Sequence, residues 1–165
     1  LVGENVIEKS WAYQNLVIVF TRTKLMAFHE YNGELIWHLD VPFSFRHQFT
    51  FYQDKIYTFG KELLVIEAVT GSILEKKTFN LSTSITCLTI TEKFICFCGV
   101  NDGKFYIHDK NTLETVFTTE VVDADKIYKE TQRIAFLEIS YPVIIGKRVF
   151  LKDAQNNLHI YEVKT

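Results

Sequence analysis

A repeated strand–turn–strand pattern is the feature that most limits how this chain of 165 residues can fold. Apolar alternating runs that lead towards a turn occur four times, as LMAFHEYNGELIW (25–37), LLVIEAVTGSILE (63–75), KFYIHDKNTLETV (104–116) and NLHIYEVKT (157–165). Gly33 and Gly71 take the same place in the first two copies, Asn111-Thr112 fills the third turn without glycine, and the fourth copy stops at the turn. Such alternation around an Asn-Gly turn is typical of a β-hairpin. The sequence therefore predicts a recurring hairpin.

Further strand-like segments precede each hairpin. One set is QNLVIVF (14–20), QDKIYTF (53–59), TEKFICF (91–97) and IGKRVFL (145–151), and another is HQFTFYQ (47–53), SITCLTI (84–90) and IAFLEIS (134–140). The unit is thus three or four short antiparallel strands that recur about every 40 residues. A single meander cannot bury both of its faces, whereas stacked meanders can. We predict an all-β fold with about four antiparallel meanders, in one domain of residues 1–165 with approximate repeats 14–42, 43–81, 82–122 and 134–165.

These segments resemble the repeats of quinoprotein-type and WD40-type β-propellers. NGELIWHL (32–39) and TGSILEKKTF (70–79) look like the propeller strand–turn–strand signature, and His108-Asp109 stands where Trp-Asp usually closes a WD-type blade. The resemblance covers most of residues 14–165 and implies a small propeller-like domain. The quinone-binding enzymes need many blades with a cofactor and metal shell, which cannot be placed on this sequence, so no cofactor is expected.

Four copies fit either a minimal propeller ring or a piece of a larger one, since propellers have about 4 to 8 blades. In the first case we expect ENVIEKSWAY (4–13) to complete the last meander and close the ring. The chain does not begin with Met, which leaves both a removed leader and a longer parent protein open.

One insertion breaks the repeat, EVVDADKIYKETQR (120–133), and we predict a loop or one short helix there. Long inserted loops on a rigid scaffold often bind partners, acidic residues suit a basic partner, and exposed aromatic residues anchor interfaces. A second aromatic loop surrounds Pro42. The predicted partner-binding residues are Glu120, Asp123, Asp125, Tyr128, Trp37, Phe43 and Phe45.

Composition narrows the class of protein. The formal charge is -2 and no dense Lys/Arg cluster occurs, so direct binding of nucleic acid is not expected. No apolar run approaches the roughly 20 residues of a membrane-spanning helix. Three cysteines are an odd number for a secreted disulfide scaffold, and Cys96 and Cys98 would project from one face of a strand. We expect buried thiols and a cytoplasmic protein.

No catalytic or metal site is predicted. His29, His108 and His159 occupy similar places in the hairpins, which leaves open a histidine-lined channel, but ordinary strand residues explain them more simply. The acids at equivalent positions are Glu30, Glu67, Asp109 and Glu162. The chain contains no G-x-S-x-G elbow, P-loop, G-x-G-x-x-G or H-E-x-x-H motif. We therefore expect no enzymatic activity.

The leading functional hypothesis is a non-enzymatic protein-binding module. A small, slightly acidic chain with an acidic loop resembles immunity proteins, which neutralise a toxin, often a basic nuclease, by covering its active site. Two alternatives stay open. The chain can be one arc of a larger propeller scaffold in a multi-subunit assembly, or a small-molecule-binding or catalytic ring that uses the histidines.

Overall fold

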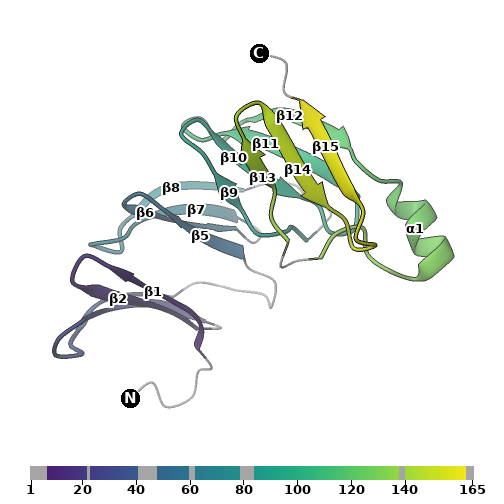
Figure 1. Ribbon diagram of the computed structural model, residues 1–165. Helices are drawn as coiled ribbons and strands as arrows, with labels where there is room; N and C mark the ends of the chain where they lie inside the picture. The colour runs from purple at the N-terminus through teal and green to yellow at the C-terminus, as the bar shows by residue number, and fades with distance from the viewer. Residues whose placement is uncertain are drawn as a thin grey trace. The chain divides into compact units, whose positions relative to one another are not determined.

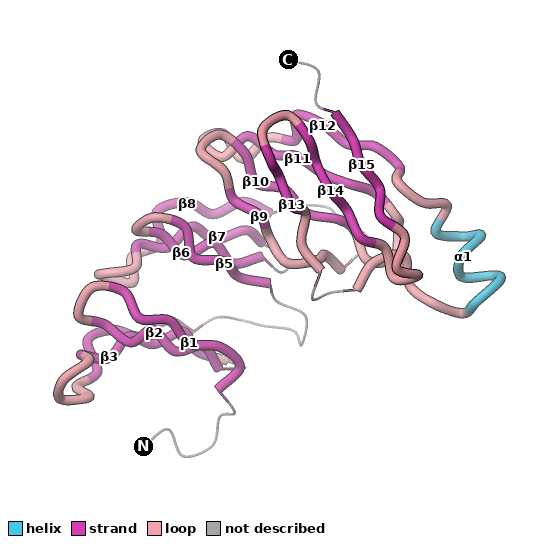
Figure 2. The backbone as a smooth tube through the Cα atoms, viewed as in Figure 1, coloured by secondary structure: helices cyan, strands magenta, loops and turns pink. Residues whose placement is uncertain are grey.

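The computed structural model describes residues 7–21, 23–40, 48–59, 62–78, 84–137 and 140–162. These residues form four antiparallel sheets and one helix (Figures 1 and 2). Within each sheet, strands that are consecutive in the sequence are neighbours. The first sheet contains β1 (Ile7–Tyr13), β2 (Leu16–Thr21), β3 (Lys24–His29) and β4 (Leu35–Asp40). The second contains β5 (Gln48–Tyr52), β6 (Lys55–Phe59), β7 (Glu62–Glu67) and β8 (Ile73–Thr78). The third contains β9 (Thr89–Ile90), β10 (Phe94–Cys98), β11 (Lys104–Asp109) and β12 (Thr115–Glu120). After α1 (Ala124–Thr131), the fourth contains β13 (Val143–Ile145), β14 (Arg148–Lys152) and β15 (Leu158–Glu162).

The chain divides into two compact units. The first comprises Leu1–His47 and Phe51–Thr78, and the second comprises Gln48–Thr50 and Phe79–Thr165. The predicted all-β class, the four antiparallel meanders and the short helix within 120–133 are confirmed.

The predicted role of residues 4–13 is wrong for the part of that segment that the structure describes. Strand β1 is not in the last sheet but pairs with β2, with Trp11 opposite Ile18 and Tyr13 opposite Leu16. A two-residue turn joins these strands, and its first residue, Gln14, has a φ of 52°. Closing so short a hairpin costs far less chain entropy than pairing with a strand more than a hundred residues away.

The turn after β3 recurs after β7 and β11. The N–H groups of Gly33, Gly71 and Leu113 each donate to the carbonyl of the last residue of the preceding strand over 2.9 Å. All three residues have positive φ, at 69°, 73° and 58°. In the third copy the glycine position is therefore taken by Leu113, whose side chain is buried. Burial of a large apolar side chain offsets the cost of left-handed backbone.

In each of the three four-stranded sheets, the strand that follows this turn carries a β-bulge near its start. Phe28 pairs with Leu35 and Ala27 with Trp37, so that Ile36 is the extra residue of β4. Leu74 of β8 and Val116 of β12 are the equivalent extra residues. All three are exposed. Bulges twist an edge strand and so hinder edge-to-edge pairing with other chains.

Apolar faces of neighbouring sheets pack together inside each unit. In the first unit the rings of Tyr13 and Phe51 lie 4.8 Å apart. In the second unit, one buried cluster joins the third and fourth sheets, and contains Cys96, Cys98, Phe105, Ile107, Ala135, Phe136, Val149 and Leu151. The predicted burial of Cys96 and Cys98 on one strand face is confirmed, and burial raises the pKa of the Cys96 thiol to about 12.

Candidate functional site: the helical insert and the loop oxygens

Helix α1 is anchored at both ends and along one side. The Asp123 carboxylate accepts a hydrogen bond from the Lys126 N–H (2.9 Å), which is an ordinary N-cap. The helix ends at Thr131, and the cap residue after it, Gln132, has a φ of 57° and donates its N–H to the Tyr128 carbonyl. Ile127 is buried, and the Val121 N–H donates to the Gly103 carbonyl (2.9 Å) just before the helix. The insert is therefore an ordered element.

The outward side of the insert carries an aromatic ring and charges of both signs. The side chain of Tyr128 is 58% exposed. Glu120 and Asp125 are exposed, and so are Lys126 and Lys129. Figures 1 and 2 show α1 projecting from the two sheets of the second unit. Four predicted residues, Glu120, Asp123, Asp125 and Tyr128, thus lie along one continuous segment, in which the lysines partly offset the acids.

The other predicted partner-binding residues are elsewhere. The Trp37 indole Nε1–H donates to the Ala68 carbonyl (3.1 Å), which ties the first sheet to the second. A Cβ on Gly71 would lie 2.6 Å from the Trp37 ring, so the ring packs directly on that glycine. Trp37 thus has a structural role, whatever else it contacts. Phe43 and Phe45 lie outside the described residues.

Each of the three repeat-related histidines makes contacts within its own sheet or turn. His29 Nδ1 accepts from the Tyr31 N–H (3.4 Å). His108 is buried, stacks 5.1 Å from Phe97 and hydrogen-bonds Thr115 (3.2 Å). His159 contacts Asp153. Over the ranges that the structure describes, no group of three or more His, Cys, Asp or Glu side chains is arranged to hold a metal ion.

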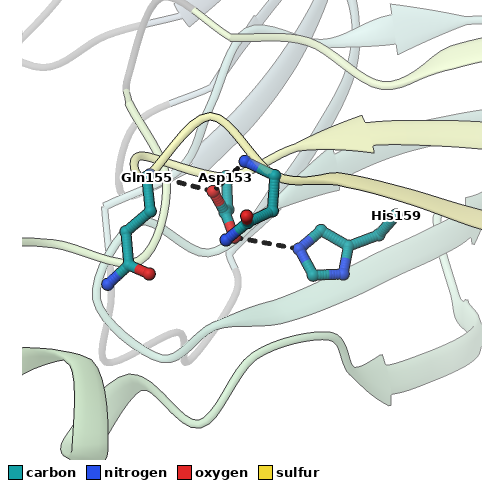
Figure 3. A network of polar contacts seen from close by, with 4 residues as sticks. Asp153, Gln155 and His159 are labelled. Atoms are coloured by element: carbon teal, nitrogen blue, oxygen red, sulfur yellow. Dashed lines mark hydrogen bonds and ion pairs between the residues drawn. The ribbon is translucent and has the colours of Figure 1, made fainter.

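The Asp153–His159 pair belongs to a polar network centred on the buried Asp153, between the end of β14 and the start of β15 (Figure 3). Asp153 Oδ1 accepts from the N–H groups of Gln155 (2.8 Å) and Asn157 (2.9 Å). Its Oδ2 accepts from Asn157 Nδ2 and lies 3.0 Å from His159 Nε2. Burial of Asp153 opposes ionisation, but the hydrogen bonds from His159, Asn157 and Gln155 outweigh it and lower the carboxyl pKa.

The sequence analysis did not predict this network. Comparison with the corresponding loop of the third sheet, between β10 and β11, indicates that the Asp153 carboxylate closes its loop. Gly99 follows β10 as Asp153 follows β14, and the N–H of each donates across the loop mouth. A Cβ on Gly99 would lie 1.9 Å from Asp102 Oδ1. The Asp102 carboxylate accepts from the Lys104 N–H (3.0 Å) and the Tyr106 hydroxyl (2.6 Å). The loop between β10 and β11 and the loop between β14 and β15 therefore each enclose a carboxylate, but the carboxylate comes from a different position in each, Asp102 in the first and Asp153 in the second.

The first sheet uses a hydroxyl for the same purpose. Thr21, at the end of β2, is fully buried, and its Oγ1 accepts from the Lys24 N–H (3.1 Å). Side-chain oxygens of Asp, Asn, Ser and Thr commonly satisfy turn N–H groups in this way. A carboxylate that orients a histidine also occurs in catalytic dyads. Here the Asp153 carboxylate also accepts three bonds from Gln155 and Asn157, which is the arrangement of a loop-closing group.

Of the acids predicted at repeat-equivalent positions, Glu30 lies in the turn after β3, whereas the others are the last residues of β7, β11 and β15, namely Glu67, Asp109 and Glu162. Asp109 Oδ1 accepts from the N–H groups of Thr112 (2.8 Å) and Asn111 (2.9 Å), and these bonds lower the pKa of its carboxyl. Glu67 accepts from the Thr70 hydroxyl. Repetition of these acids follows from repetition of the turns.

The chain matches no family model and no curated protein sequence. Its fold is similar to solved β-propeller structures. The computationally designed Ika4 protein matches with a TM-score of 0.73 and 14% identity, over 99% of this chain and 96% of Ika4. BamB from Moraxella catarrhalis matches with a TM-score of 0.61 and 14% identity, over 90% of this chain and 43% of BamB. Kluyveromyces lactis Hsv2 matches with a TM-score of 0.71 and 8% identity, over 98% of this chain and 50% of Hsv2.

These matches confirm the predicted resemblance to β-propellers. The chain spans almost all of Ika4 but about half the length of the two natural proteins. Among the described residues, the helix is too short and too polar to cross a lipid bilayer.

Proposed function

We propose that this protein is a non-enzymatic protein-binding module whose partner contacts the helical insert. The observation that carries the proposal is the exposure of Tyr128 on an anchored helix inserted between two propeller-type sheets. Tyrosine supplies a large contact area at low entropic cost, and aromatic residues are enriched among binding hot spots. The propeller fold by itself carries no function, so the proposal rests on this surface.

More specifically, we propose a cytoplasmic immunity protein that neutralises a toxin, with a basic nuclease domain as the favoured partner. Glu120 and Asp125 flank the aromatic anchor and would attract a basic surface, because complementary charge speeds association and sets register. Acidic side chains that cover a nuclease site would take the places of substrate phosphates. Lys126 and Lys129 restrict the choice of partner, since a purely basic surface would meet like charges there.

A second candidate function follows from the length of the match. Because the chain spans about half of BamB and Hsv2, it can be an arc of a larger propeller scaffold. This candidate predicts partners that cover sheet faces, whereas the first predicts a partner on α1.

The test is affinity capture from the native cell, with tagged residues 1–165 as bait and mass spectrometry as readout. Tyr128→Ala combined with Asp125→Lys should remove the captured partner. Tyr31→Ala is the matched control, because Tyr31 is even more exposed and lies in a turn of the first unit. Asp123→Asn keeps the helix cap and removes only its charge, whereas Asp123→Ala removes both.

One small basic protein that is captured by the native bait and by Tyr31→Ala, but not by the double variant, would support the proposal. Equal capture by all baits would exclude the insert as the binding surface. Capture of large-complex subunits through the sheet faces would favour the scaffold arc instead.

A further inference from the structure

The fourth sheet has three strands, whereas each of the other sheets has four. By register, β13, β14 and β15 correspond to β9, β10 and β11, so the strand that is missing is the counterpart of β4, β8 and β12. Strand β15 (yellow in Figure 1) is therefore an edge of its sheet, and no described strand pairs with it on the side away from β14. The second unit thus contains a sheet that lacks one strand of its own repeat.

The main-chain groups of β15 that face this open edge can be assigned from the other sheets. In each complete sheet, the last residue of the third strand donates its N–H to the segment that leads into the fourth strand. These pairs are His29 with Glu34 (2.8 Å), Glu67 with Ser72 (2.9 Å) and Asp109 with Glu114 (2.8 Å). Glu162 takes the same place at the end of β15. Because hydrogen bonds to the two sides alternate along an antiparallel strand, the N–H and C=O groups of Leu158, Ile160 and Glu162 point to the open edge.

The edge of β15 lacks the protection that the outer strands of the other sheets have. Strands β4, β8 and β12 each contain a β-bulge. The register of β15 with β14 is regular throughout, and its sequence LHIYE contains neither proline nor lysine. Bulges, prolines and lysines are the usual devices that keep an edge from pairing with another chain. Strand β15 is therefore the outer strand best suited to accept a further strand.

An exposed aromatic ring lies beside the place of the missing strand. Phe117 of β12 is opposite Ile107 and so lies on the face of the third sheet that packs on the fourth. Its equivalent in the first sheet, Trp37, is opposite Ala27 and packs on Gly71, in the turn that leads into the fourth strand of the second sheet. Phe117, by contrast, is 50% exposed. An added strand beside β15 would begin at the position equivalent to that turn and place side chains over Phe117.

We propose that an extended segment of a partner protein adds to β15 as an antiparallel fourth strand, with main-chain hydrogen bonds to Leu158, Ile160 and Glu162. Main-chain bonds give such strand addition its affinity, and alternate side chains give it specificity. The position opposite Ile160 is apolar in two of the three complete sheets, and so is the position opposite Tyr161. The apolar residues are Trp37 and Phe117 at the first position and Leu35 and Ile73 at the second. The segment that fits best therefore has apolar residues at both positions.

A second copy of this chain fits the edge less well than a single segment. Antiparallel pairing of β15 with the β15 of another copy puts the same face of both fourth sheets on one side. On that side the fourth sheet already packs on the third through Val149 and Leu151, with Tyr161 against the same cluster. The two third sheets would therefore compete for the same space. No residue of α1 belongs to this edge, so the inference does not depend on the proposed partner surface.

The test is hydrogen exchange detected by nuclear magnetic resonance on the isotope-labelled full chain, with and without an excess of the peptide ELIWHLD. This peptide has the sequence of residues 34–40, which include β4. In the chain alone, the amides of Leu158, Ile160 and Glu162 should exchange faster than those of His159 and Tyr161, which face β14. The peptide should slow the first three amides roughly tenfold or more and leave the other two unchanged. A peptide of the same composition in an order that breaks the alternation should have no effect.

Three variants separate the edge from the rest of the sheet. Ile160→Pro removes an outward N–H, which an edge strand tolerates, and should abolish the effect of the peptide on Leu158 and Glu162. Phe117→Ala should weaken peptide binding roughly tenfold through loss of an aromatic anchor. Ile145→Ala is the matched control, because Ile145 is exposed in the same sheet but lies on the opposite edge strand, β13.

A fused chain keeps the test decisive if the free peptide binds weakly. Residues 68–78, which contain the turn and fourth strand of the second sheet, are placed directly after Glu162, so that the added strand is present at a high effective concentration. The amides of Leu158 and Ile160 should then be protected. Amides that stay unprotected in the fused chain, or that are already protected in the native chain alone, would overturn the proposal. Sedimentation velocity of the native chain tells whether such protection comes from a second copy.

Discussion

Side-chain oxygen atoms stabilise several hairpin loops of this protein by accepting hydrogen bonds from backbone N–H groups. Asp153, Asp102 and Thr21 each place a side-chain oxygen on the N–H groups of a hairpin loop. A buried polar group that loses its partners costs about 1 to 3 kcal/mol. These loops are therefore places where a change of one atom affects the stability of a whole hairpin.

Asp153→Asn should lower the free energy of unfolding at neutral pH by about 1 to 3 kcal/mol, because an amide cannot accept all the bonds that the carboxylate accepts. Urea unfolding of the native chain and the variant at pH 7 measures this difference. Gln155→Ala is the control, since Gln155 contributes only its backbone N–H to the network and should be close to neutral.

The same pair of proteins has a defined pH dependence. The pKa of Asp153 is lower in the folded chain than its ordinary value near 4, so the carboxyl of the unfolded chain takes up a proton first as the pH falls. Its stabilising effect is complete above about pH 5 and is lost progressively below about pH 4. The stability difference between the native chain and Asp153→Asn should therefore shrink in acid. A difference that stays constant from pH 7 to pH 3 would contradict this account.

Two glycines at equivalent turn positions should respond differently to alanine. Gly33 has a φ of 69° and open space around it, so Gly33→Ala should cost only the strain of left-handed backbone, about 1 to 2 kcal/mol. Gly71 has a φ of 73° and lies against Trp37, so Gly71→Ala should cost a further 1 to 3 kcal/mol, roughly, from overpacking. Chemical denaturation of both variants measures the gap. Adding Trp37→Ala should reduce the extra cost at Gly71 and leave that at Gly33 unchanged.

At the scale of elements, the helical insert tests how an isolated helix is held on a β-scaffold. Asp123→Ala should destabilise α1 by about 1 kcal/mol through loss of its N-cap, and Asp123→Asn by much less. Hydrogen exchange of the α1 amides should therefore quicken about fivefold in the first variant only. Equal exchange in both variants would mean that Ile127 alone holds the helix.

The hairpins can be predicted from the sequence because their signals are local. Alternation and turn residues such as Asn32-Gly33 lie within a few positions of the strands that they join. The partner predicted for β1 is wrong, because the composition of residues 4–13 suits an edge of any sheet. The glycine position held by Leu113 is not predictable either, since a buried leucine with positive φ depends on tertiary packing.

The candidate site can be predicted only in part. The insert is recognisable because it breaks the repeat, and the structure places Glu120, Asp123, Asp125 and Tyr128 along it. Trp37 stands out in the sequence as an aromatic residue near a turn, but the carbonyl of Ala68 that binds its indole is 31 residues away in the chain. Asp153 is in principle recognisable as a loop-closing residue, because the N–H groups of Gln155 and Asn157 that it accepts from are two and four positions away. Its contact with His159 depends on the pairing of β14 with β15.

For the whole molecule, the sequence predicts that strands are covered on both faces but not how many sheets are needed to cover them. In the second unit, the third and fourth sheets cover each other through one buried cluster that includes Cys96, Phe105 and Val149.

The two carboxylate-filled loops have a consequence for how relatives of this chain would be recognised. The third sheet takes its carboxylate from Asp102 and keeps glycine at 99, while the fourth takes it from the position equivalent to Gly99. In both loops a carboxylate accepts hydrogen bonds from backbone N–H groups, although the two loops share no residue at equivalent positions. Substitutions at 99 and 102 should therefore be correlated in evolution, and a search that scores each column independently would overlook such repeats.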